Sequence, residues 1–291
     1  FGTFDQLLEN NQEQLRTLIT ELDSKPQEAG SVAQKISMLY EMGLDSVKLN
    51  TEGLAPVKEQ LDAINRLGTK ADVAKMVATL HKEGMAPFFA MNIVQMYQAG
   101  LGMGDRDYYL VEDDASVKMR DAYKQFINQL FTLTGASPEQ AEAAVNAVMK
   151  IETGIAKSSF SREDLRDSQK NYNKIKLQEF KANNNPLDWD VYFESLGLME
   201  IEYLDAKQLP FYEALGEFMK NVSIDEQKYY LAFNLLNAAA PYLSDDFVAA
   251  EFDFYGKVMS GKLEQKPRWK RSLSTVNSAL GEAVGQMYVA K

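Results

Sequence analysis

The sequence contains no cysteine and only one histidine, His81, and both shortages restrict the chemistry that it can support. Without cysteine there can be no disulfide bond, no thiolate nucleophile and no metal site with sulfur ligands. A Ser-His-Asp triad would have to use His81, which lies at the polar end of an expected helix. We therefore expect no nucleophilic catalysis of either kind from these residues.

Positive charge and long apolar runs are also scarce. The 31 Lys and Arg residues stand against 42 Asp and Glu residues, which gives a net charge of −11. A nucleic-acid-binding protein needs a basic surface, so we expect no nucleic-acid partner. No run of about 18 apolar residues occurs, so no transmembrane segment is expected in this chain. The 291 residues, 45% of them hydrophobic, are enough for one large core or two helical subdomains.

Apolar residues recur at steps of three and four along most of the chain, which predicts an all-α fold of about ten to twelve helices. Capping patterns and Gly or Pro residues mark many of the helix ends. One or two short extended segments are expected as well, near residues 87–94 and 200–206. The expected helices cover residues 1–22, 31–42, 55–68, 69–84, 113–133, 137–155, 177–180, 188–197, 210–219, 223–240, 244–255 and 274–289.

The last expected helix carries two glycines, Gly281 and Gly285, four residues apart. Each glycine costs about 1 kcal/mol of helix stability relative to alanine. Such a cost is tolerable where something packs very closely, so we expect this helix to lie against another element. Its apolar face consists of Val276, Leu280, Ala283, Val284 and Met287.

A glycine-rich segment, Gly100-x-Gly-x-Gly104, has the composition of a phosphate-binding loop. It does not match the dinucleotide fingerprint, because Asp105 occupies the place of the third glycine and would repel a phosphate. We interpret it as a tight connection held by Arg106, Asp107 and two tyrosines. Acidic pairs at 113–114 and 245–246 precede helices, where they favour the positive end of the helix dipole. They are therefore interpreted as caps and not as calcium ligands.

Three longer motifs resemble those of the M13 zinc metallopeptidases, the family of neprilysin and endothelin-converting enzyme, and in particular its bacterial PepO-type members. The resemblance extends from Phe1 to the last residue and covers only the N-terminal, non-catalytic part of that family. The motifs are Gln98-Ala-Gly-Leu-Gly-Met-Gly-Asp-Arg-Asp-Tyr-Tyr-Leu110, Arg166-Asp-x-x-Lys-Asn-Tyr-Asn-Lys174, and Phe254-Tyr-Gly-Lys-x-x-Ser-Gly followed by Pro267-Arg-Trp-Lys-Arg and Asn277-x-x-Leu-Gly-Glu-Ala-Val-Gly-Gln-x-Tyr288.

The resemblance implies that residues 1–291 form the helical lid of a two-domain peptidase. A thermolysin-like catalytic domain is expected C-terminal to residue 291 and absent from this chain, and the two domains would enclose a chamber that admits peptides. Zinc peptidases of this class need H-E-x-x-H, in which two histidines four apart bind the metal. A single histidine cannot supply this pattern. Zinc is therefore expected in the parent enzyme with no ligands in this chain, and the chain alone is expected to be inactive.

One residue is a candidate for substrate binding. Phe1-Gly-Thr-Phe-Asp5 resembles a family segment in which an arginine just before the aromatic, together with this aspartate, holds the end of a bound peptide on the primed side. The arginine would precede Phe1 and is absent from the chain, so Asp5 alone remains. An equal alternative is that Asp5 caps the first helix, and one carboxylate can do both.

Further expectations concern the setting of the chain. A start at Phe1 and not at Met suggests a processed or trimmed product. The lack of cysteine does not fix the compartment, and the resemblance alone suggests export by a bacterium to its periplasm, its surface or the medium. The family's polar turn between two strands is missing near residues 89–92. Either the protein has a deletion there or residues of the natural chain are omitted, and we expect the second. An alternative function is a stand-alone binding or interaction domain, or a pseudo-enzyme lacking its catalytic half.

Overall fold

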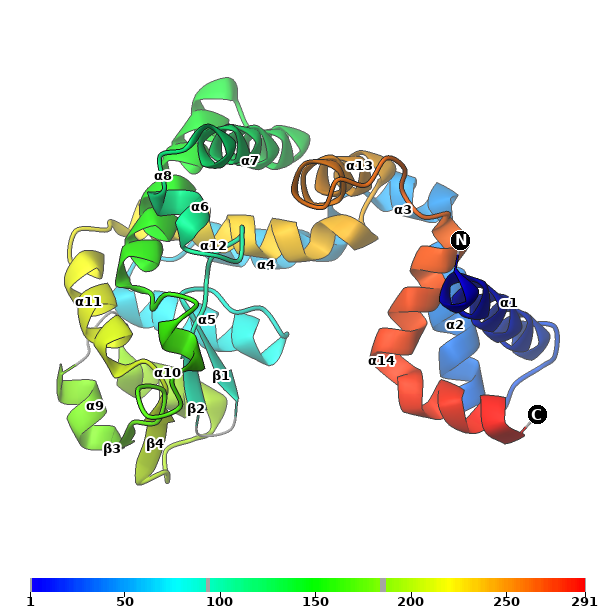
Figure 1. The fold of residues 1–291 in the computed structure, drawn as a ribbon, viewed down its shortest axis with the longest axis horizontal. Helices are drawn as coiled ribbons and strands as arrows, with labels where there is room; N and C mark the ends of the chain where they lie inside the picture. Colours follow the sequence, from blue (N-terminus) through cyan, green and yellow to red (C-terminus); the bar gives the residue numbers. More distant parts are fainter. Residues whose placement is uncertain (1, 93–94, 184–186, 291) are drawn as a thin grey trace. The chain divides into compact units, whose positions relative to one another are not determined.

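The fold is given by a computed structural model that describes residues 2–92, 95–183 and 187–290, without the side chains of residues 90–92. Figure 1 shows the chain coloured along its sequence. It divides into two compact units. Unit 1 combines Phe1–Gly53 with Lys262–Lys291, and unit 2 is the continuous segment Leu54–Gly261. The expectation of one large core or two helical subdomains is thus resolved in favour of two units.

Unit 1 is built from the first and last helices of the chain. Ile19, Ile36, Val276 and Val284 form much of its core, so three helices distant in sequence share one apolar centre. The apolar face expected for the last helix is confirmed, because its other members pack against this core. The helices of unit 1 are α1 (Thr3–Asp23), α2 (Val32–Leu44), α3 (Ser46–Glu52) and α14 (Arg268–Ala290).

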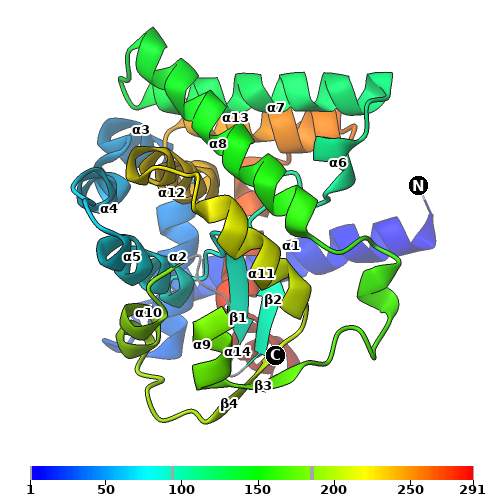
Figure 2. The same ribbon diagram turned by 90° about the vertical axis from the view of Figure 1, so that its left-hand side faces the viewer.

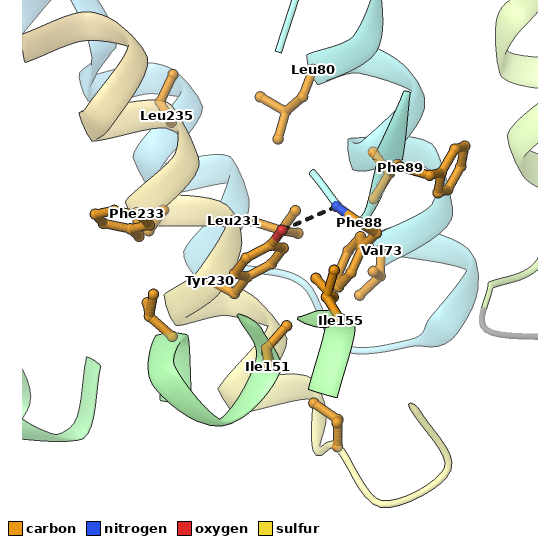
Figure 3. Packing of buried hydrophobic residues seen from close by; sticks show 14 of the residues in the cluster. Val73, Leu80, Phe88, Phe89, Ile151, Ile155, Tyr230, Leu231, Phe233 and Leu235 are labelled. Atoms are coloured by element: carbon orange, nitrogen blue, oxygen red, sulfur yellow. Dashed lines mark hydrogen bonds between the residues drawn. The ribbon is translucent and has the colours of Figure 1, made fainter. Parts of the chain in front are cut away.

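Unit 2 contains the larger core, and α12 (Ile224–Ala239) lies at its centre against α4, α5, α7 and α8. Figure 3 shows how side chains from several helices meet around Tyr230 of α12. The other elements of unit 2 are α4 (Ala55–Asn65), α5 (Lys70–Lys82), β1 (Phe89–Asn92), β2 (Gln95–Gln98), α6 (Asp107–Leu110), α7 (Asp114–Leu133), α8 (Pro138–Ser158), the 3-10 helix η1 (Asp164–Arg166), β3 (Lys174–Lys176), α9 (Leu177–Asn183), α10 (Trp189–Leu196), β4 (Tyr203–Ala206), α11 (Leu209–Met219), the 3-10 helix η2 (Ala240–Tyr242), α13 (Asp245–Glu251) and the π-helix η3 (Phe252–Met259).

The all-α prediction is confirmed, with a small four-stranded sheet in the order β1-β2-β4-β3 as its only sheet in the described residues (Figure 2). β2 and β4 run parallel, with Gln95 opposite Asp205, and the two outer pairs are antiparallel. The extended segments near 87–94 and 200–206 were expected, whereas β3 was not. Its three residues are too few to show an alternating pattern.

The helix starts agree well with the capping patterns. Ser137 and Ser223 each form a reciprocal capping box with the residue three positions on, and Thr69 does so with Asp72. Asp113 accepts a hydrogen bond from the backbone of Ser116 and is the N-cap of α7. Two short helices, α3 and α6, were not expected, and they bring the described α-helices to fourteen, above the expected ten to twelve.

The expectation that the last helix lies against another element is confirmed, because α14 packs on α2 and α1. Gly281 and Gly285 are not the points of contact. A Cβ atom built on either glycine would meet no atom within 4 Å, because both face away from the core of unit 1. The close approach is made by Gly43 of α2, where a Cβ would lie 2.2 Å from the Oγ of Ser272 on α14. The backbone of α14 bends just before Gly281, at Leu280, whose φ of −133° is not helical.

The hairpin near residues 89–92 is short. Asn92 pairs with Gln95, so two residues connect β1 to β2. These residues, 93–94, lie outside the described part of the chain, and the expectation of omitted natural residues here stays a prediction. Among the described helices, none has both the length and the apolar character needed to cross a lipid bilayer.

Candidate functional site

The one substrate-binding candidate, Asp5, lies on the surface of unit 1 in the first turn of α1. Its Oδ2 accepts a hydrogen bond of 3.1 Å from the backbone N–H of Gly2. This bond satisfies a free donor at the start of the helix, as expected for a capping role. The carboxylate is exposed, so the same group can also receive a ligand.

His81 belongs to the interior of unit 2. Its Nδ1 lies 2.7 Å from the Tyr192 hydroxyl, its Nε2 lies 3.4 Å from the Pro87 carbonyl, and its ring meets the ring of Phe89 edge-on. Burial lowers the pKa of His81 to about 4, so the ring is neutral at pH 7. The histidine therefore holds α5, α10 and the start of β1 together.

The glycine loop at residues 100–104 is a tight connection, but two of its carbonyls are held by Tyr230 and Tyr255, which are distant in sequence and were not expected. Tyr230 donates to the carbonyl of Gly100 at 2.8 Å and accepts from the Phe88 backbone at 3.1 Å, the bond drawn in Figure 3. Tyr255 donates to the carbonyl of Gly102 at 3.0 Å. In this arrangement, the backbone N–H groups of the loop are not positioned to bind a phosphate.

Beneath the loop lies a carboxylate that the sequence reading missed, Glu152 of α8, which is 1% exposed. Tyr109 donates to its Oε2 at 2.5 Å, and Tyr123 lies 3.0 and 3.1 Å from its two oxygens. Burial raises the pKa of Glu152 to about 7, although both hydroxyls and the Gly102 N–H act in the opposite direction. A signal was available, because Glu152 falls four residues after Val148 on the apolar face of its helix.

The second motif, residues 166–174, is a loop fastened to the sheet. Asn171 donates to two carbonyls of its own loop, those of Asp164 and Asp167, at 2.7 Å each. Asn173 donates its backbone N–H to Asp205 of β4 at 2.9 Å and its side chain to the Lys207 carbonyl. The two asparagines of the motif therefore hold the backbone of the loop in position.

The third motif has two parts, one in each unit. In unit 2, Phe254 of the π-helix stacks on Phe126 with ring centroids 5.3 Å apart and an angle of 8° between the rings. In unit 1, the ring of Trp269 contacts the guanidinium of Arg16, 4.5 Å from the ring centre, and Lys270 pairs with Glu9. Cation–π contacts of this kind bind α14 to α1.

The residues of the described chain do not fit a zinc site. No group of three or more His, Cys, Asp or Glu side chains within it is arranged to hold a metal ion. The one histidine is turned toward Tyr192, inside unit 2. No catalytic step through a metal can therefore be assigned to these side chains.

Comparison with known proteins shows which family the chain resembles. A family model described as Peptidase family M13 matches residues 1–291. Human endothelin-converting enzyme 1 is 24% identical over 312 residues, which is 99% of this chain and 40% of that protein. The endothelin-converting enzyme homolog of Locusta migratoria is 25% identical over 324 residues, 99% of this chain and 44% of that protein.

Solved structures agree in fold. The zinc metalloprotease Zmp1 of Mycobacterium tuberculosis, in complex with an inhibitor, superimposes with a TM-score of 0.93 at 24% identity, over 100% of this chain and 46% of that one. PepO from Lactobacillus rhamnosis gives a TM-score of 0.78 at 17% identity, over 98% of this chain and 46% of that one. The chain thus spans less than half the length of the relatives it matches. With a family model matched along its entire length, the chain belongs to peptidase family M13.

Proposed function

We propose that this chain is the non-catalytic helical domain of an M13 zinc metalloendopeptidase, where it covers the active-site chamber and limits substrates to peptides. The observation that carries the proposal is a fold shared across the whole chain with zinc metalloproteases, combined with the lack of any metal-holding group of side chains among the residues that the structure describes. The catalytic half of the parent protein would supply the metal and its ligands.

Exposed apolar side chains on unit 1 support an interaction with the catalytic half of the parent protein. Phe4 of α1 is 88% exposed, Val47 of α3 is 77% exposed and Val289 of α14 is 85% exposed. Gly281 and Gly285 also face open space, where another backbone could approach closely. Large apolar side chains left this exposed can mark an interaction surface. The catalytic half of the same protein is the partner that we propose for it, with residues 266–289 near the contact.

Within this function, Asp5 is proposed to bind the end of the peptide on the primed side of the cleaved bond. Its exposed carboxylate supports this role. Export from a bacterial cell is proposed on family resemblance.

The test compares the purified 291-residue chain with the intact parent protein on a short fluorogenic peptide, in the presence of zinc. We expect the parent to cleave the peptide and the chain to be inactive at every zinc concentration. The same peptide inserted in a folded domain should resist the parent, because a covered chamber excludes folded substrates.

Three results would contradict the proposal in whole or in part. Zinc-dependent cleavage by the 291-residue chain alone would show that it carries its own catalytic site. A parent sequence without H-E-x-x-H would favour the alternative, a binding domain or pseudo-enzyme without peptidase activity. Equal cleavage of the free and the folded substrate would remove the size-limiting role and leave the family assignment unchanged.

A further inference from the structure

The buried carboxylate of Glu152 has no part in the function proposed above, and its surroundings are unusual for an acidic side chain. Four tyrosines from four elements interact with it: Tyr109 of α6 and Tyr123 of α7 bond to the carboxylate, and its charge raises the pKa of Tyr230 of α12 and Tyr255 of the π-helix. We call these five residues the tyrosine cluster. Burial raises the pKa of the carboxylate, and three groups lower it: the Tyr109 hydroxyl, the Tyr123 hydroxyl and the Gly102 N–H. None of them, within the described residues, is a cation.

The glycine loop is the lid of this cluster. The N–H of Gly102 bonds to the carboxylate, and the N–H of Met103 donates to the Tyr109 hydroxyl at 3.0 Å. A Cβ on Gly102 would lie 1.9 Å from the Tyr123 hydroxyl oxygen, so the loop backbone rests directly on the ring. Carboxylate, hydroxyls and loop amides therefore form one connected network, and a change at one member reaches the others.

The loop also has the backbone features of a hinged segment. Gly100 and Gly104 have φ values of +93° and +77°, a region that glycine adopts at little cost. A Cβ built on Gly104 would meet no neighbour within 4 Å, whereas one on Gly100 would lie 2.6 Å from the Tyr230 hydroxyl oxygen. The loop is therefore packed tightly at its first glycine and openly at its last, where the Gly104 N–H donates to the Leu101 carbonyl at 3.0 Å. Between these two glycines, the connections to the tyrosine cluster hold the loop closed.

We propose that Glu152 and its four tyrosines form a proton-operated latch, which closes the glycine loop firmly in acid and loosens it as the carboxylate ionises. Ionisation places an uncompensated negative charge in an apolar interior, which costs free energy even with hydroxyl donors nearby. Opening the loop admits water to the carboxylate and relieves that cost.

The sign of the effect follows from the pKa. The pKa of Glu152 is about 7 with the loop closed, above the ordinary value of 4.5 that applies once water reaches the group. The closed loop therefore binds the proton more tightly than the open loop. Its extra stability is complete below pH 4.5 and is lost as the pH rises through 7. The opening equilibrium should increase by about tenfold or more between pH 5 and pH 8, since one pKa unit corresponds to a factor of ten.

Amide hydrogen exchange of the full chain tests the latch. Protection factors of the Gly102 and Met103 amides, corrected for the intrinsic pH dependence of exchange, should fall about tenfold or more from pH 5 to pH 8. Amides at the centre of α12, such as that of Phe233, should change much less and serve as an internal reference. In Glu152→Gln, the loop amides should differ by less than about twofold between the two pH values.

Glu226→Gln is the matched control. Glu226 is also a helix glutamate of unit 2, but it lies in a capping box and pairs with Lys150 at 2.6 Å. This variant should keep the pH dependence of the loop. A loop that responds to pH equally in wild type and Glu152→Gln would overturn the proposal, as would a wild-type loop with equal protection at both pH values.

A second measurement does not depend on the folding of a variant. The side-chain carboxyl of Glu152 can be titrated in the wild-type chain by ¹³C NMR. A midpoint near pH 7, with a simultaneous shift of the Met103 amide signal, is expected from the latch. A midpoint at pH 5 or below would overturn it, because the carboxylate would then already be ionised throughout the range in which the loop is expected to respond.

Discussion

Burial acts in opposite directions on two titratable side chains of unit 2. It raises the pKa of Glu152 to about 7 and lowers the pKa of His81 to about 4, because an apolar interior disfavours the charged form of each. As the pH falls, the folded state gains stability from the first and loses stability from the second. The two contributions to the pH dependence of stability therefore oppose each other. A variant that removes one of the two groups is needed to measure either contribution.

His81 should make the folded chain sensitive to acid. Because its pKa is about 4 when folded and 6.5 when unfolded, the unfolded state binds more protons between these values, and stability falls as the pH drops through them. His81→Gln should reduce the loss of unfolding free energy between pH 7.5 and pH 4.5 by about 2 to 3 kcal/mol. Urea unfolding at the two pH values measures this difference.

Tyr192→Phe is the control for that substitution. It removes the hydroxyl that lies 2.7 Å from His81 and leaves the imidazole able to titrate. It should therefore lower stability at both pH values and preserve the acid sensitivity. An acid response that is the same in wild type and His81→Gln would show that His81 is protonated equally in both states.

Asp5→Asn separates the two roles of the carboxylate. In the intact parent enzyme, loss of the charge should raise KM several-fold for a peptide with an amidated C-terminus, whose N–H groups can donate to the carboxylate. KM for a peptide with a free C-terminus should stay unchanged or fall, because its negative end is repelled by the Asp5 carboxylate. Thermal unfolding of the 291-residue chain measures the capping role, which should cost about 0.5 to 1 kcal/mol. Equal effects on both peptides would restrict Asp5 to capping.

At the residue level, the sequence allowed the helix caps to be inferred, since these depend on neighbours in the chain. It did not show that His81 contacts Tyr192, which lies 111 residues away. The sequence also did not show that Glu152 is the centre of a hydrogen-bonded cluster. Its partners, Tyr109 and Tyr123, come from other helices, and their approach depends on tertiary packing. A charged residue on an apolar helix face was the available signal.

At the scale of elements, long helices with capping boxes were predicted closely, while short elements were missed. Helices such as α7 and α8 contain five or more turns, so periodicity and caps reinforce each other. α3 and β3 contain seven and three residues, which is too few for a periodic signal. Their formation depends on contacts with distant segments, such as the pairing of β3 with β4.

The glycines of unit 1 give a prediction at this scale. Gly285 lies in helix α14 and faces open space, so Gly285→Ala should stabilise the isolated chain by about 0.5 to 1 kcal/mol. Gly43→Ala should destabilise it, because the new methyl group would collide with Ser272 and separate α2 from α14. Urea unfolding of both variants provides the measurement. A destabilising Gly285→Ala would mean that another surface of the isolated chain covers this face.

At the scale of the whole molecule, the division into units could not be read from local patterns. Unit 1 is discontinuous, and its core joins Ile19 and Ile36 to Val276 and Val284 across more than two hundred residues of unit 2. No turn or composition shift marks such a pairing in the sequence. Unit 2, in contrast, is continuous and has its own large core.

Because unit 2 is continuous and unit 1 is not, fragments of the two units should differ in their ability to fold alone. Residues 54–261 expressed alone should fold, with a cooperative thermal transition and dispersed NMR signals, because no side chain of their core comes from unit 1. Residues 1–53 and 262–291 should each remain largely unfolded alone, because each lacks half of a shared apolar core, and should gain helix when mixed. Circular dichroism of the separate and mixed fragments provides the comparison. A gradual, non-cooperative transition for residues 54–261 would mean that unit 2 needs unit 1 to fold.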